Sequence, residues 1–565
     1  MTRYTLADAV PEAIQKELES LPKLTSQLLY NRSVTTAKAA EIFLNPHYED
    51  GQHDPFLMAG MEKAAGRILE AVKKEDKIII YSDYDCDGIP GGVVLHDFFN
   101  AVGYKGFENY IPHRHYEGFG LNVSAVEKLA AEGAELIITI DCGTGDIEPV
   151  DKANELGVDV IITDHHEPGK KLPKAVAIVN PKIGDTYPFK ELCGTGVVFK
   201  LVQALIAKGN FELKEGWEKW WLDMVGMATI ADMVPLIGEN RVFATYGLRV
   251  LRKSRRPGLQ KLLYKAGANQ RYLTEDDIGF TIGPRINAAS RMDNPEDAFS
   301  LLSETDEGEA GTHVEHLEKL NNERKGLVAS ISKELHKRLD ELDELPPVLV
   351  LGNPDWRPSL VGLAAGKLAE LHKRPAFIWG RDGNGVIKGS CRSDGKASVV
   401  ELMRATPDSF LEYGGHHFSG GFAVVDDKIH NLSRELNEAW EILGSKAVVE
   451  EEKMIDALLS LDEVNGRLVN ELNTVGPFGV GNHKPLFKFE KVTPVSVELF
   501  GKTKEHTKLL FDTQNGRLEA ISFFTTPEEF QVEPKAGETI SLLGHVEESF
   551  FMGRKQIRLR IVEIV

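Results

Sequence analysis

The chain has 565 residues and a formal net charge of −20, and 42% of its residues are hydrophobic. This length predicts roughly three or four domains, each with enough apolar residues for a core. The acidic balance argues against a protein that coats nucleic acid with a basic surface. The four cysteines (Cys86, Cys142, Cys193 and Cys391) form no CxxC pair, which argues against zinc fingers and a disulfide framework.

The sequence has no signal for export or membrane insertion. Its first residues include early acids and lack the apolar core of a signal peptide. No uninterrupted apolar run reaches the length of about 18 residues that a membrane span needs. We therefore expect a cytoplasmic protein with reduced cysteines and no membrane contact.

Short β-branched runs in the first half predict a parallel sheet. The segments between them are long enough for crossover helices, which is typical of a doubly wound α/β domain. A mostly apolar helix is expected afterwards at Trp217–Leu236. The predicted strands are Lys77–Tyr81, Glu135–Ile140 and Val158–Thr163.

The next segment, Arg241–Tyr272, is rich in lysine and arginine and contains no acidic residue. Such a track could hold a polyanion in a cleft of an otherwise acidic protein. A solvated basic helix is the commoner explanation of such a run, and we adopt that interpretation for this segment.

The second half predicts a long helix at Gly308–Leu345, followed by a second α/β unit and a β-rich end. The second unit has strand-like segments at Val348–Gly352, Pro375–Gly380 and Gly421–Val425, with glycine-rich turns at 383–390 and 412–421. From about Glu451, short strand-like runs separated by turns predict a small antiparallel barrel.

Acidic and imidazole side chains follow each of the first three predicted strands. Asp83, Asp85 and Asp87 follow the first strand, Asp141 the second, and Asp164, His165 and His166 the third. In open α/β sheets, ligands bind outside the carboxyl ends of the strands, so these groups should converge. A single aspartate there is usually a turn former or a helix cap, but the combined set is not explained in that way.

So many carboxylates in one crevice would repel one another unless cations neutralise them. Oxygen ligands with a minority of imidazole suit Mn²⁺ or Mg²⁺ better than Zn²⁺. Two such ions could clamp a phosphate and lower the pKa of a bound water for an in-line displacement. The sequence therefore predicts a metal-dependent phosphodiesterase.

The motifs YSDYDCDG, ITIDCG, ITDHHEP and ATIADMVPL, in this order, resemble the four motifs of the DHH phosphoesterase superfamily. Further segments resemble the RecJ-type exonucleases of that superfamily, which degrade single strands in the 5′→3′ direction. These segments are YIPHRHYEGFGL, IGPRINAASRM, GSCRS, GGHHFSGGF and PFGVGNHKPLF. The resemblance extends from about Asp50 to the C-terminus.

The resemblance implies a role for each motif residue. It makes Asp85, Asp87, Asp141, His165 and Asp232 metal ligands, with Asp141 as a bridge. His166 is expected near the scissile phosphate, and Asp164 is expected to orient the histidines. Many superfamily members have a histidine where this sequence has Tyr81. Asp83 could replace that ligand, so the assignment of Asp83, Asp85 and Asp87 to particular ions stays open.

Selection of a 5′ end requires groups that bind a terminal phosphate. Bidentate arginines and a hydroxyl suit this task, and the resemblance places Arg114, Arg285, Ser390 and Arg392 in the pocket. Asn287, which belongs to the same motif as Arg285, is also expected to bind substrate. Gly414, Gly415 and His416 form a glycine-rich turn that could approach the substrate backbone.

The resemblance implies five parts of an α/β chain. These are an N-terminal helical segment (1–50), a parallel-sheet DHH catalytic domain (51–245), a helical connector (246–345), a DHHA1-like substrate-binding domain (346–448) and an OB-fold-like domain (449–565). The last part would bind single strands through aromatic and basic side chains. The candidates are Phe500, Phe523, Phe524, Phe550, Phe551, Lys502, Lys504 and Arg554.

We therefore expect a monomeric exonuclease that uses two Mn²⁺ or Mg²⁺ ions to degrade single-stranded DNA to 5′-mononucleotides in recombination and repair. The resemblance implies a single-strand-binding protein and a helicase as partners. One alternative is a relative that cleaves short oligonucleotides or cyclic dinucleotides, although such relatives generally lack the C-terminal barrel. A second alternative is an inactive DNA-binding scaffold, although such members lose motif acids that this sequence retains.

Overall fold

The computed structural model describes residues 3–565 except 396, 444–451, 502–503 and 552–553, and it leaves out the side chains of 550, 551 and 554. The chain forms two compact units. One comprises His53–Val234 and Tyr246–Val449, and the other comprises Met1–Gln52, Pro235–Thr245 and Glu450–Val565.

The larger unit begins with a five-stranded parallel sheet, which confirms the predicted fold class. Two of its strands, at the sheet edges, were not predicted; they are short, with four residues in β3 and three in β6. In spatial order the strands are β3 (Phe107–Tyr110), β2 (Ile78–Ser82), β4 (Leu136–Ile140), β5 (Asp159–Thr163) and β6 (Ala177–Val179).

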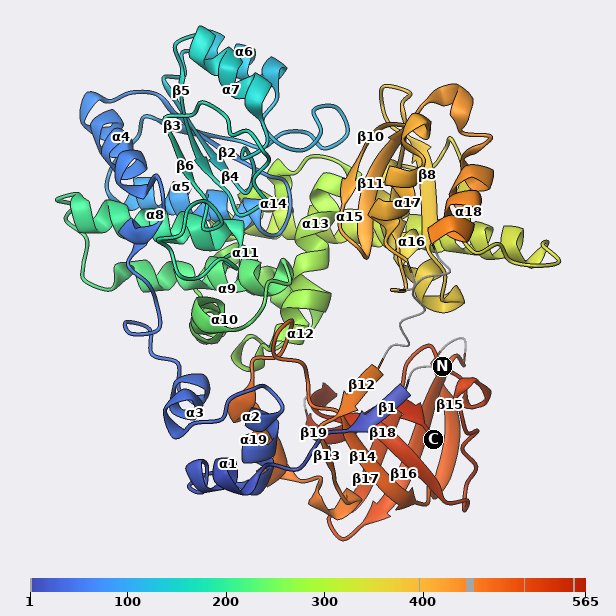
Figure 1. Ribbon diagram of the computed structural model, residues 1–565. Helices are drawn as coiled ribbons and strands as arrows, with labels where there is room; N and C mark the ends of the chain where they lie inside the picture. The colour runs from blue at the N-terminus through green and yellow to red at the C-terminus, as the bar shows by residue number, and fades with distance from the viewer. Residues whose placement is uncertain (1–2, 396, 444–451, 502–503, 552–553) are drawn as a thin grey trace. The chain divides into compact units, whose positions relative to one another are not determined.

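Helices cover both faces of this sheet (Figure 1). On one face, Tyr81 of β2 packs with Leu129 and Val150, which belong to two helices of that face. Strands β2 and β4 are buried throughout, as expected for a sheet covered on both sides. The helices of the first face are α6 (Val123–Ala131) and α7 (Ile147–Glu155), and those of the other are α4 (Met61–Lys74), α5 (Gly88–Ala101) and α8 (Gly194–Lys208).

The helix predicted at Trp217–Leu236 is shorter than expected. A 3-10 turn, η2 (Trp217–Trp221), precedes the α-helix α9 (Leu222–Ala231). The helix ends at Asp232 because the next residue, Met233, adopts a left-handed conformation with φ of 61°. This early end places Asp232 at the helix terminus.

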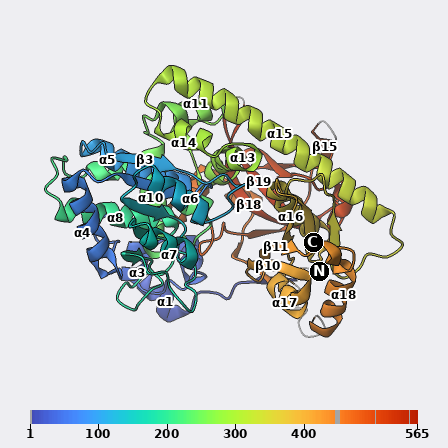
Figure 2. The same ribbon diagram turned by 90° about the horizontal axis from the view of Figure 1, so that it is seen from above.

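A helical layer follows, and its last member is the predicted long helix, α15 (Glu307–Asp340). Figure 2 shows α15 as one continuous rod that runs from this layer to the second sheet of the same unit. The preceding helices are α10 (Gly238–Leu251), α11 (Pro257–Ala266), α12 (Glu275–Asp277), the π-helical η4 (Ile278–Ile282), α13 (Gly283–Met292) and α14 (Glu296–Ser303).

The interpretation of the basic segment as a solvated helix was wrong for three of its arginines. Arg241 is 3% exposed and donates to the Val475 carbonyl at 3.0 Å. Arg256 is largely buried and pairs with Asp223 at 2.9 Å and with Asp97 at 2.6 Å. Arg252 donates to the Leu273 carbonyl at 2.6 Å through Nη2. These guanidinium groups therefore satisfy buried acceptors instead of forming an open track.

The second sheet of the larger unit has the strand order β10-β11-β9-β8-β7. The two segments expected to be glycine-rich turns contribute strands, because paired glycines such as Gly414 and Gly421 let β10 and β11 approach as a hairpin. The strands are β7 (Leu349–Gly352), β8 (Ala376–Arg381), β9 (Ile387–Arg392), β10 (Phe410–Gly415) and β11 (Ser419–Val424). Helix α16 (Pro358–His372) packs on one face and α17 (Val399–Ala405) and α18 (Leu432–Leu443) on the other.

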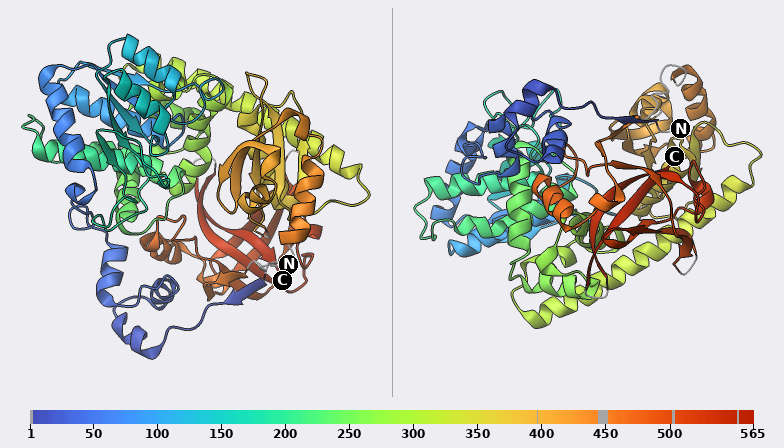
Figure 3. Two further views of the ribbon diagram at one scale, coloured as in Figure 1. Left: turned by 45° about the horizontal axis from the view of Figure 1, so that its top comes forward. Right: turned by 90° about the horizontal axis from the view of Figure 1, so that it is seen from below.

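The smaller unit joins the two ends of the chain. Strand β1 (Arg3–Leu6) pairs in parallel with β12 (Glu452–Ile455), and Figure 3 shows β1 beside the C-terminal strands. Leu28 of α2 belongs to the core of the C-terminal sheet. The helices of this unit are α1 (Glu12–Glu17), α2 (Lys23–Tyr30), α3 (Ala37–Leu44) and α19 (Gly466–Val475). The five-part division of the chain stays a prediction.

The C-terminal sheet differs from the antiparallel barrel that we expected. The pairs β13–β14 and β17–β19 are parallel, so the sheet is mixed. Within the described residues it is not closed, because its end strands β13 and β15 do not pair. The order is β13 (Ala457–Leu458), β14 (Phe487–Val492), β18 (Ile540–Phe551), β19 (Arg554–Ile564), β17 (Gly516–Ser522), β16 (His506–Thr513) and β15 (Ser496–Phe500). Among the described helices, none is both long and apolar enough to cross a bilayer.

Candidate metal centre

The acidic and imidazole residues lie at the carboxyl ends of neighbouring strands, as the sequence predicts. Asp83 follows β2, Asp141 follows β4 and Asp164 follows β5, and these strands are adjacent in the sheet. Asp232 joins the set from the end of α9. Because these strands are parallel, their carboxyl ends share one edge and deliver their side chains to the same place.

Asp141 lies at the centre of this edge in an unusual backbone conformation. Its φ is 61°, in the left-handed region that a non-glycine residue adopts only when its surroundings impose it. The start of α8 lies against it, since a Cβ on Gly194 would be 2.6 Å from the Asp141 Cβ. A glycine at 194 therefore permits the close approach of α8 to the carboxylate.

His165 connects the carboxylates of three different elements. Its Nε2 lies 3.1 Å from Oδ1 of Asp141, and 3.7 Å from Oδ2 of both Asp87 and Asp232. His166 also approaches Oδ1 of Asp141, at 3.8 Å from its Nδ1.

Three groups of side chains have ligand atoms close enough to hold a cation, with all atoms of a group within 4.8 Å of one another. The first contains Asp87, His165 and Asp232, and the second contains Asp83, Asp85 and Asp141. The third contains Asp141 with both histidines. Asp141 belongs to the second and third groups, and its Oδ1 lies 3.1 Å from Nε2 of His165, which belongs to the first and third. This central place is expected of a ligand shared by two ions.

The electrostatics of the site favour cations. Burial and the nearby carboxylates raise the pKa of Asp141 well above its usual value. The same causes raise the pKa of Asp232 to about 9 and also raise the pKa of Asp83. Without positive charge, Asp232 would therefore be protonated at neutral pH, and ionisation of Asp83 and Asp141 would be disfavoured.

The hydrogen bonding of the site also fits a metal. Oδ1 of Asp83 is buried without a hydrogen-bond partner among the described residues, and buried Oδ1 of Asp141 accepts no hydrogen bond, although the His165 ring nitrogen lies 3.1 Å away. An unpaired buried carboxylate oxygen is costly, and coordination to a divalent ion satisfies it. Carboxylate oxygens with one or two imidazole nitrogens are the ligand set that Mn²⁺ and Mg²⁺ accept.

Asp164 orients the two histidines. Its Oδ1 accepts from the backbone N–H of His165 at 2.7 Å and lies 2.8 Å from Nδ1 of His166, while its Oδ2 accepts from Thr144 N–H at 2.9 Å. Burial opposes ionisation of Asp164, but the hydrogen bonds from His166 and Thr144 lower its pKa. For His166, burial lowers the pKa, yet the Asp164 contact raises it above the usual histidine value overall.

The loop that carries Asp85 and Asp87 is held by two other segments, the N-terminus of α8 and helix α13. Asp87 accepts from the N–H groups of Gly194 at 2.6 Å and Thr195 at 2.7 Å, at the N-terminus of α8. Asn287 of α13 accepts from the N–H of Cys86 at 2.8 Å through its Oδ1. The side-chain carbonyl oxygen of Asn287 therefore contacts this loop, and its predicted role in substrate binding stays a prediction.

Tyr81, which stands where many superfamily members have a histidine, faces away from the site. Its ring is buried with the core of α6 and α7, and its hydroxyl donates to the Gly120 carbonyl at 2.9 Å. Asp83 lies within ligand distance of Asp85 and Asp141. The geometry therefore makes Asp83 a candidate ligand in this chain.

Two of the predicted phosphate-binding arginines lie close to the metal centre or its supports. The guanidinium carbon of Arg114 is 4.7 Å from the centroid of the Tyr84 ring, in the loop between Asp83 and Asp85. Arg285 of α13 pairs with Glu318 of α15 at 2.7 Å and donates to the Thr281 carbonyl. Arg285 would have to exchange this ion pair to bind a phosphate.

The other predicted residues lie on the second sheet. Ser390 and Arg392 are two positions apart on β9, so both face α16, where a Cβ on Gly362 would be 3.1 Å from Ser390 Oγ and 3.4 Å from Arg392 Nη2. His416 is exposed at the β10–β11 turn and its N–H donates to the Ser419 carbonyl. Gly415 has a φ of 138° at the same turn.

Two residues near the metal centre, Phe119 and Arg291, were not predicted from the sequence. Phe119 is 55% exposed, and its ring centroid lies 5.5 Å from that of His166. Arg291 is largely buried near Arg114 and Arg324. Its burial is the main cause that lowers its pKa, and the two neighbouring positive charges lower it further. Phe119 belongs to the YIPHRHYEGFGL motif and Arg291 to IGPRINAASRM, so both could have been proposed from their motifs.

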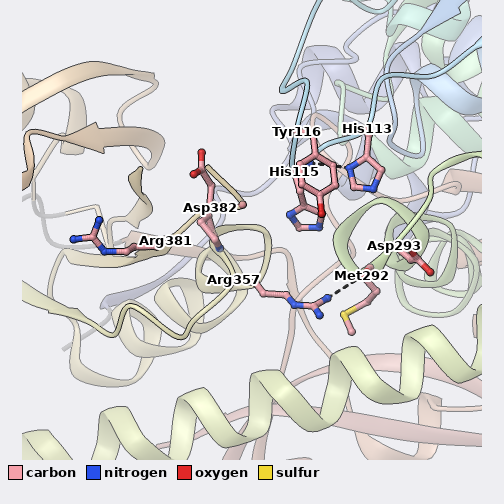
Figure 4. Close-up of a pocket in the computed structure, with 10 residues that line it drawn as sticks. His113, His115, Tyr116, Met292, Asp293, Arg357, Arg381 and Asp382 are labelled. Atoms are coloured by element: carbon pink, nitrogen blue, oxygen red, sulfur yellow. Dashed lines mark hydrogen bonds between the residues drawn. The ribbon is translucent and has the colours of Figure 1, made fainter. Parts of the chain in front are cut away.

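A pocket lies beside this region, where the segment after β3 faces the start of α16 and the β8–β9 turn (Figure 4). Its lining includes His113, His115 and Tyr116 on one side and Arg357 and Asp382 on the other. Arg357 donates to the Met292 carbonyl at 2.9 Å, as the dashed line in Figure 4 shows.

The C-terminal sheet carries an aromatic cluster that matches part of the predicted set. The His506 ring lies 4.8 to 5.2 Å from those of Phe500, Phe523 and Phe524. Arg560 lies over Phe523 at 4.1 Å, and Phe524 is 75% exposed. Lys504 is exposed nearby in sequence. Lys502 and the side chains of Phe550, Phe551 and Arg554 lie outside the described residues.

Three family models match the chain. The DHH family N-terminal domain matches residues 77–229, the DHHA1 domain matches 345–441, and the RecJ OB domain matches 455–563. Together they cover the candidate metal centre except Asp232, the second sheet, and the C-terminal sheet except the last residue of β19.

Individual relatives match over most of the chain. The single-stranded-DNA-specific exonuclease RecJ of Bacillus subtilis (strain 168) is 35% identical over 558 residues, which cover 97% of this chain and 69% of that protein. The protein of the same name from Escherichia coli (strain K12) is 31% identical over 83% of each chain. The crystal structure of RecJ in complex with Mn²⁺ from Thermus thermophilus matches with a TM-score of 0.83 at 26% identity, covering 100% of this chain and 79% of that one.

Substitution of Asp141 should have opposite effects on the stability of the apo protein and on its stabilisation by Mn²⁺. We expect Asp141→Asn to leave the apo protein as stable as the wild type or more stable, because it removes a buried repulsive charge. The same variant should lose most of the stabilisation by Mn²⁺, which for a wild-type site at a hundredfold excess over Kd is about 2.7 kcal/mol. Differential scanning calorimetry with and without Mn²⁺ measures both effects.

Asp185→Asn serves as the control, because Asp185 is an exposed aspartate of the same unit. The control should keep the wild-type response to Mn²⁺. An Asp141→Asn protein that is stabilised by Mn²⁺ as strongly as the wild type would remove Asp141 from the metal centre.

Proposed function

This chain belongs to the RecJ family of single-stranded-DNA-specific exonucleases, and we propose that it degrades single-stranded DNA from the 5′ end to 5′-mononucleotides. The observation that carries the proposal is the convergence of Asp83, Asp85, Asp87, Asp141, His165 and Asp232 at one sheet edge in a chain of this family. A role in recombination and repair follows from the same family membership.

Two divalent ions, Mn²⁺ or Mg²⁺, would supply charge neutralisation for the phosphate and activation of water. Asp87, His165 and Asp232 would hold one ion, and Asp83, Asp85 and Asp141 would hold the other, with Asp141 contacting both. The N-terminus of α8 holds Asp87 in place, and Asn287 holds the preceding backbone N–H. The carboxylates are therefore positioned before the substrate arrives.

His166 is proposed to act on the scissile phosphate. It is half-exposed, whereas His165 is largely buried among the carboxylates. Its contact with Asp164 raises its pKa and so favours the protonated ring. A protonated His166 can donate a hydrogen bond to a phosphate oxygen or a proton to the leaving oxygen.

The 5′ end would be recognised by Arg114, Arg285, Ser390 and Arg392. Two of these, Ser390 and Arg392, share one face of β9, so a hydroxyl and a guanidinium lie side by side. Gly415 and His416, at the turn of the adjacent hairpin, would approach the sugar–phosphate backbone. Charge-assisted hydrogen bonds from arginine suit a terminal phosphate, which carries more charge than an internal one.

The downstream strand is proposed to stack on the aromatic cluster of Phe500, His506, Phe523 and Phe524. Each ring centroid lies within 6 Å of that of His506 or Phe500, and Arg560 lies over the Phe523 ring. Stacking on aromatic side chains beside a cation binds single strands without a requirement for sequence.

Other parts of the proposal rest on family membership alone. They are the partnership with a single-strand-binding protein and a helicase, the monomeric state and the cytoplasmic location. The four cysteines are free and buried, which is compatible with a reducing compartment.

Strand polarity provides the main test. A 3′-labelled single strand with Mn²⁺ should yield a ladder of progressively shorter labelled products, while a 5′-labelled strand should release labelled mononucleotide from the start. A chelator should stop both reactions. Hydrolysis of dinucleotides without shortening of long strands would instead favour a small-substrate phosphodiesterase, and binding without hydrolysis would favour a scaffold.

Arg392→Ala should reduce the preference for a 5′-phosphate by about 10- to 100-fold, because it removes charged hydrogen bonds worth about 1.5–3 kcal/mol. The measurement is the ratio of kcat/KM on 5′-phosphorylated and 5′-hydroxyl strands. Arg404→Ala, on an exposed arginine of α17, is the control and should keep the wild-type ratio. An unchanged ratio in Arg392→Ala would exclude that residue from the phosphate pocket.

Phe524→Ala should weaken binding to a long single strand by about tenfold, since stacking contributes about 1–3 kcal/mol per base. The effect should be small on strands too short to reach the C-terminal sheet. Fluorescence anisotropy with strands of increasing length measures it. Leu499→Ala, which shortens an exposed apolar side chain on β15, should bind as the wild type does. Equal affinity of Phe524→Ala and wild type at every length would argue against the stacking surface.

A further inference from the structure

Helices α13 and α16 of the larger unit are joined by a reciprocal pair of hydrogen bonds. Nη1 of Arg291 donates to the Ser359 carbonyl at 2.6 Å, and Oγ of Ser359 donates to the Arg291 carbonyl at 2.8 Å. Arg357 adds a bond to the Met292 carbonyl at 2.9 Å, next to the pocket of Figure 4. We call the contacts of Arg291, Ser359, Arg357 and Met292 the α13–α16 joint.

The joint is well protected from solvent. Ser359 is 6% exposed, and the Arg291 side chain is largely buried. No carboxylate forms an ion pair with Arg291 within the part of the chain that the structure describes. Burying a guanidinium that has no ion-pair partner costs free energy, and the nearby Asp85 charge offsets only part of this cost, since the pKa of Arg291 is lowered overall.

On one side, the joint is connected to the metal centre. Asn287 accepts from the N–H of Cys86, in the loop between Asp85 and Asp87. Asn287 and Arg291 are four residues apart on α13, which places them on the same face of that helix. A shift of the C-terminal end of α13 would therefore be transmitted to the loop that carries two of the proposed metal ligands.

On the other side, the joint is connected to β9. Gly362 lies three residues after Ser359 on α16, so it follows on the same face. A Cβ there would be 3.1 Å from Ser390 Oγ and 3.4 Å from Arg392 Nη2, which is closer than most carbon contacts. Helix α16 thus packs tightly on the two side chains that are proposed to hold the 5′ phosphate.

We propose that the α13–α16 joint sets the spacing between the metal centre and the Ser390–Arg392 pair, and so selects the first phosphodiester bond for cleavage. This inference rests on the proposed function. Arg291 and Ser359 are positioning residues that act through α13 and α16 and do not touch the substrate. With the 5′ phosphate held at a fixed distance from the metal centre, only one phosphodiester bond can reach the proposed ligands.

Loss of the joint should change where the enzyme cuts, whereas a purely stabilising contact would change only how much protein is folded. Displacement of a reacting group by about 1 Å can reduce a rate by about 100-fold. A looser joint should therefore lower kcat more than it raises KM, and it should let the second phosphodiester bond compete with the first.

The experiment uses the full-length protein with Mn²⁺ and a 5′-phosphorylated single strand, and it analyses the products by length. Arg291→Met and Ser359→Ala should each release dinucleotides along with mononucleotides. For Arg291→Met we expect kcat to fall by about 10- to 100-fold, with a KM within about threefold of the wild type. Melting temperature is recorded for each variant, because Arg291→Met alters a buried side chain and a loss of folded protein must be separated from a change in cleavage.

A second pair of variants tests the contact with β9 independently of Arg291. Gly362→Ala should displace Ser390 and Arg392, while Gly366→Ala is the matched control, since its Cβ would have only Arg392 Cγ at 4.0 Å. Both changes replace a glycine of α16 by alanine, so their intrinsic effects on helix stability are the same. Gly362→Ala should release dinucleotides and Gly366→Ala should not.

Hydrolysis of bis(4-nitrophenyl) phosphate reports the metal centre without a 5′ phosphate. Ser359→Ala and Gly362→Ala should keep this activity within about twofold of the wild type. If these variants and Arg291→Met release only mononucleotides at the wild-type rate, the inference is wrong and the proposed function stands. If the wild type itself does not release mononucleotides from the 5′ end, both are wrong.

Discussion

Mutual repulsion among buried carboxylates is the constraint on which the larger unit depends. Four aspartates at the sheet edge have a raised pKa because each is removed from water and lies near the others. Such a set is unfavourable in an apo protein and favourable around divalent cations. The surrounding structure holds these groups together against their repulsion, so much of the local architecture can be understood as support for this edge.

That support comes mainly from the backbone. The N-terminus of α8 directs two N–H groups at Asp87, and three N–H groups hold Asp164. Backbone donors keep a carboxylate in place without adding a mobile side chain, and a helix N-terminus favours negative charge. The left-handed backbone conformation of Asp141 also depends on this support, because only a rigid surrounding structure can impose such a conformation on a non-glycine residue.

Cationic groups lie around the acidic centre rather than within it. Arg114 lies over Tyr84, next to two of the aspartates, and Arg291 lies near Arg114, Arg324 and Asp85. Arg285 is held by Glu318. An anionic strand would thus meet arginines around a site whose own charge depends on bound metal. The pairing of Arg285 with Glu318 also means that one proposed phosphate ligand has a competing partner in the absence of substrate.

The sequence by itself determined the α/β class, the three strands that carry the acids, and most of the metal-ligand candidates. It could do so because buried parallel strands are short apolar runs, and polar groups at their carboxyl ends must share an edge. Asp232 could be named only from the family motif, since an acid at a helix end has no pattern of its own. Residues that depend on the resemblance, such as Arg392, stay predictions about function.

Only the tertiary structure decided how those residues are used. It placed Tyr81 in the core, gave Asn287 to the Cys86 N–H and paired Arg285 with Glu318. It also showed that the glycine-rich segments form a hairpin and that the C-terminal sheet is mixed and open within the described residues. These features depend on contacts between residues distant in sequence. Local composition shows that a side chain can bind or pair, but the packing of other elements decides which partner it meets.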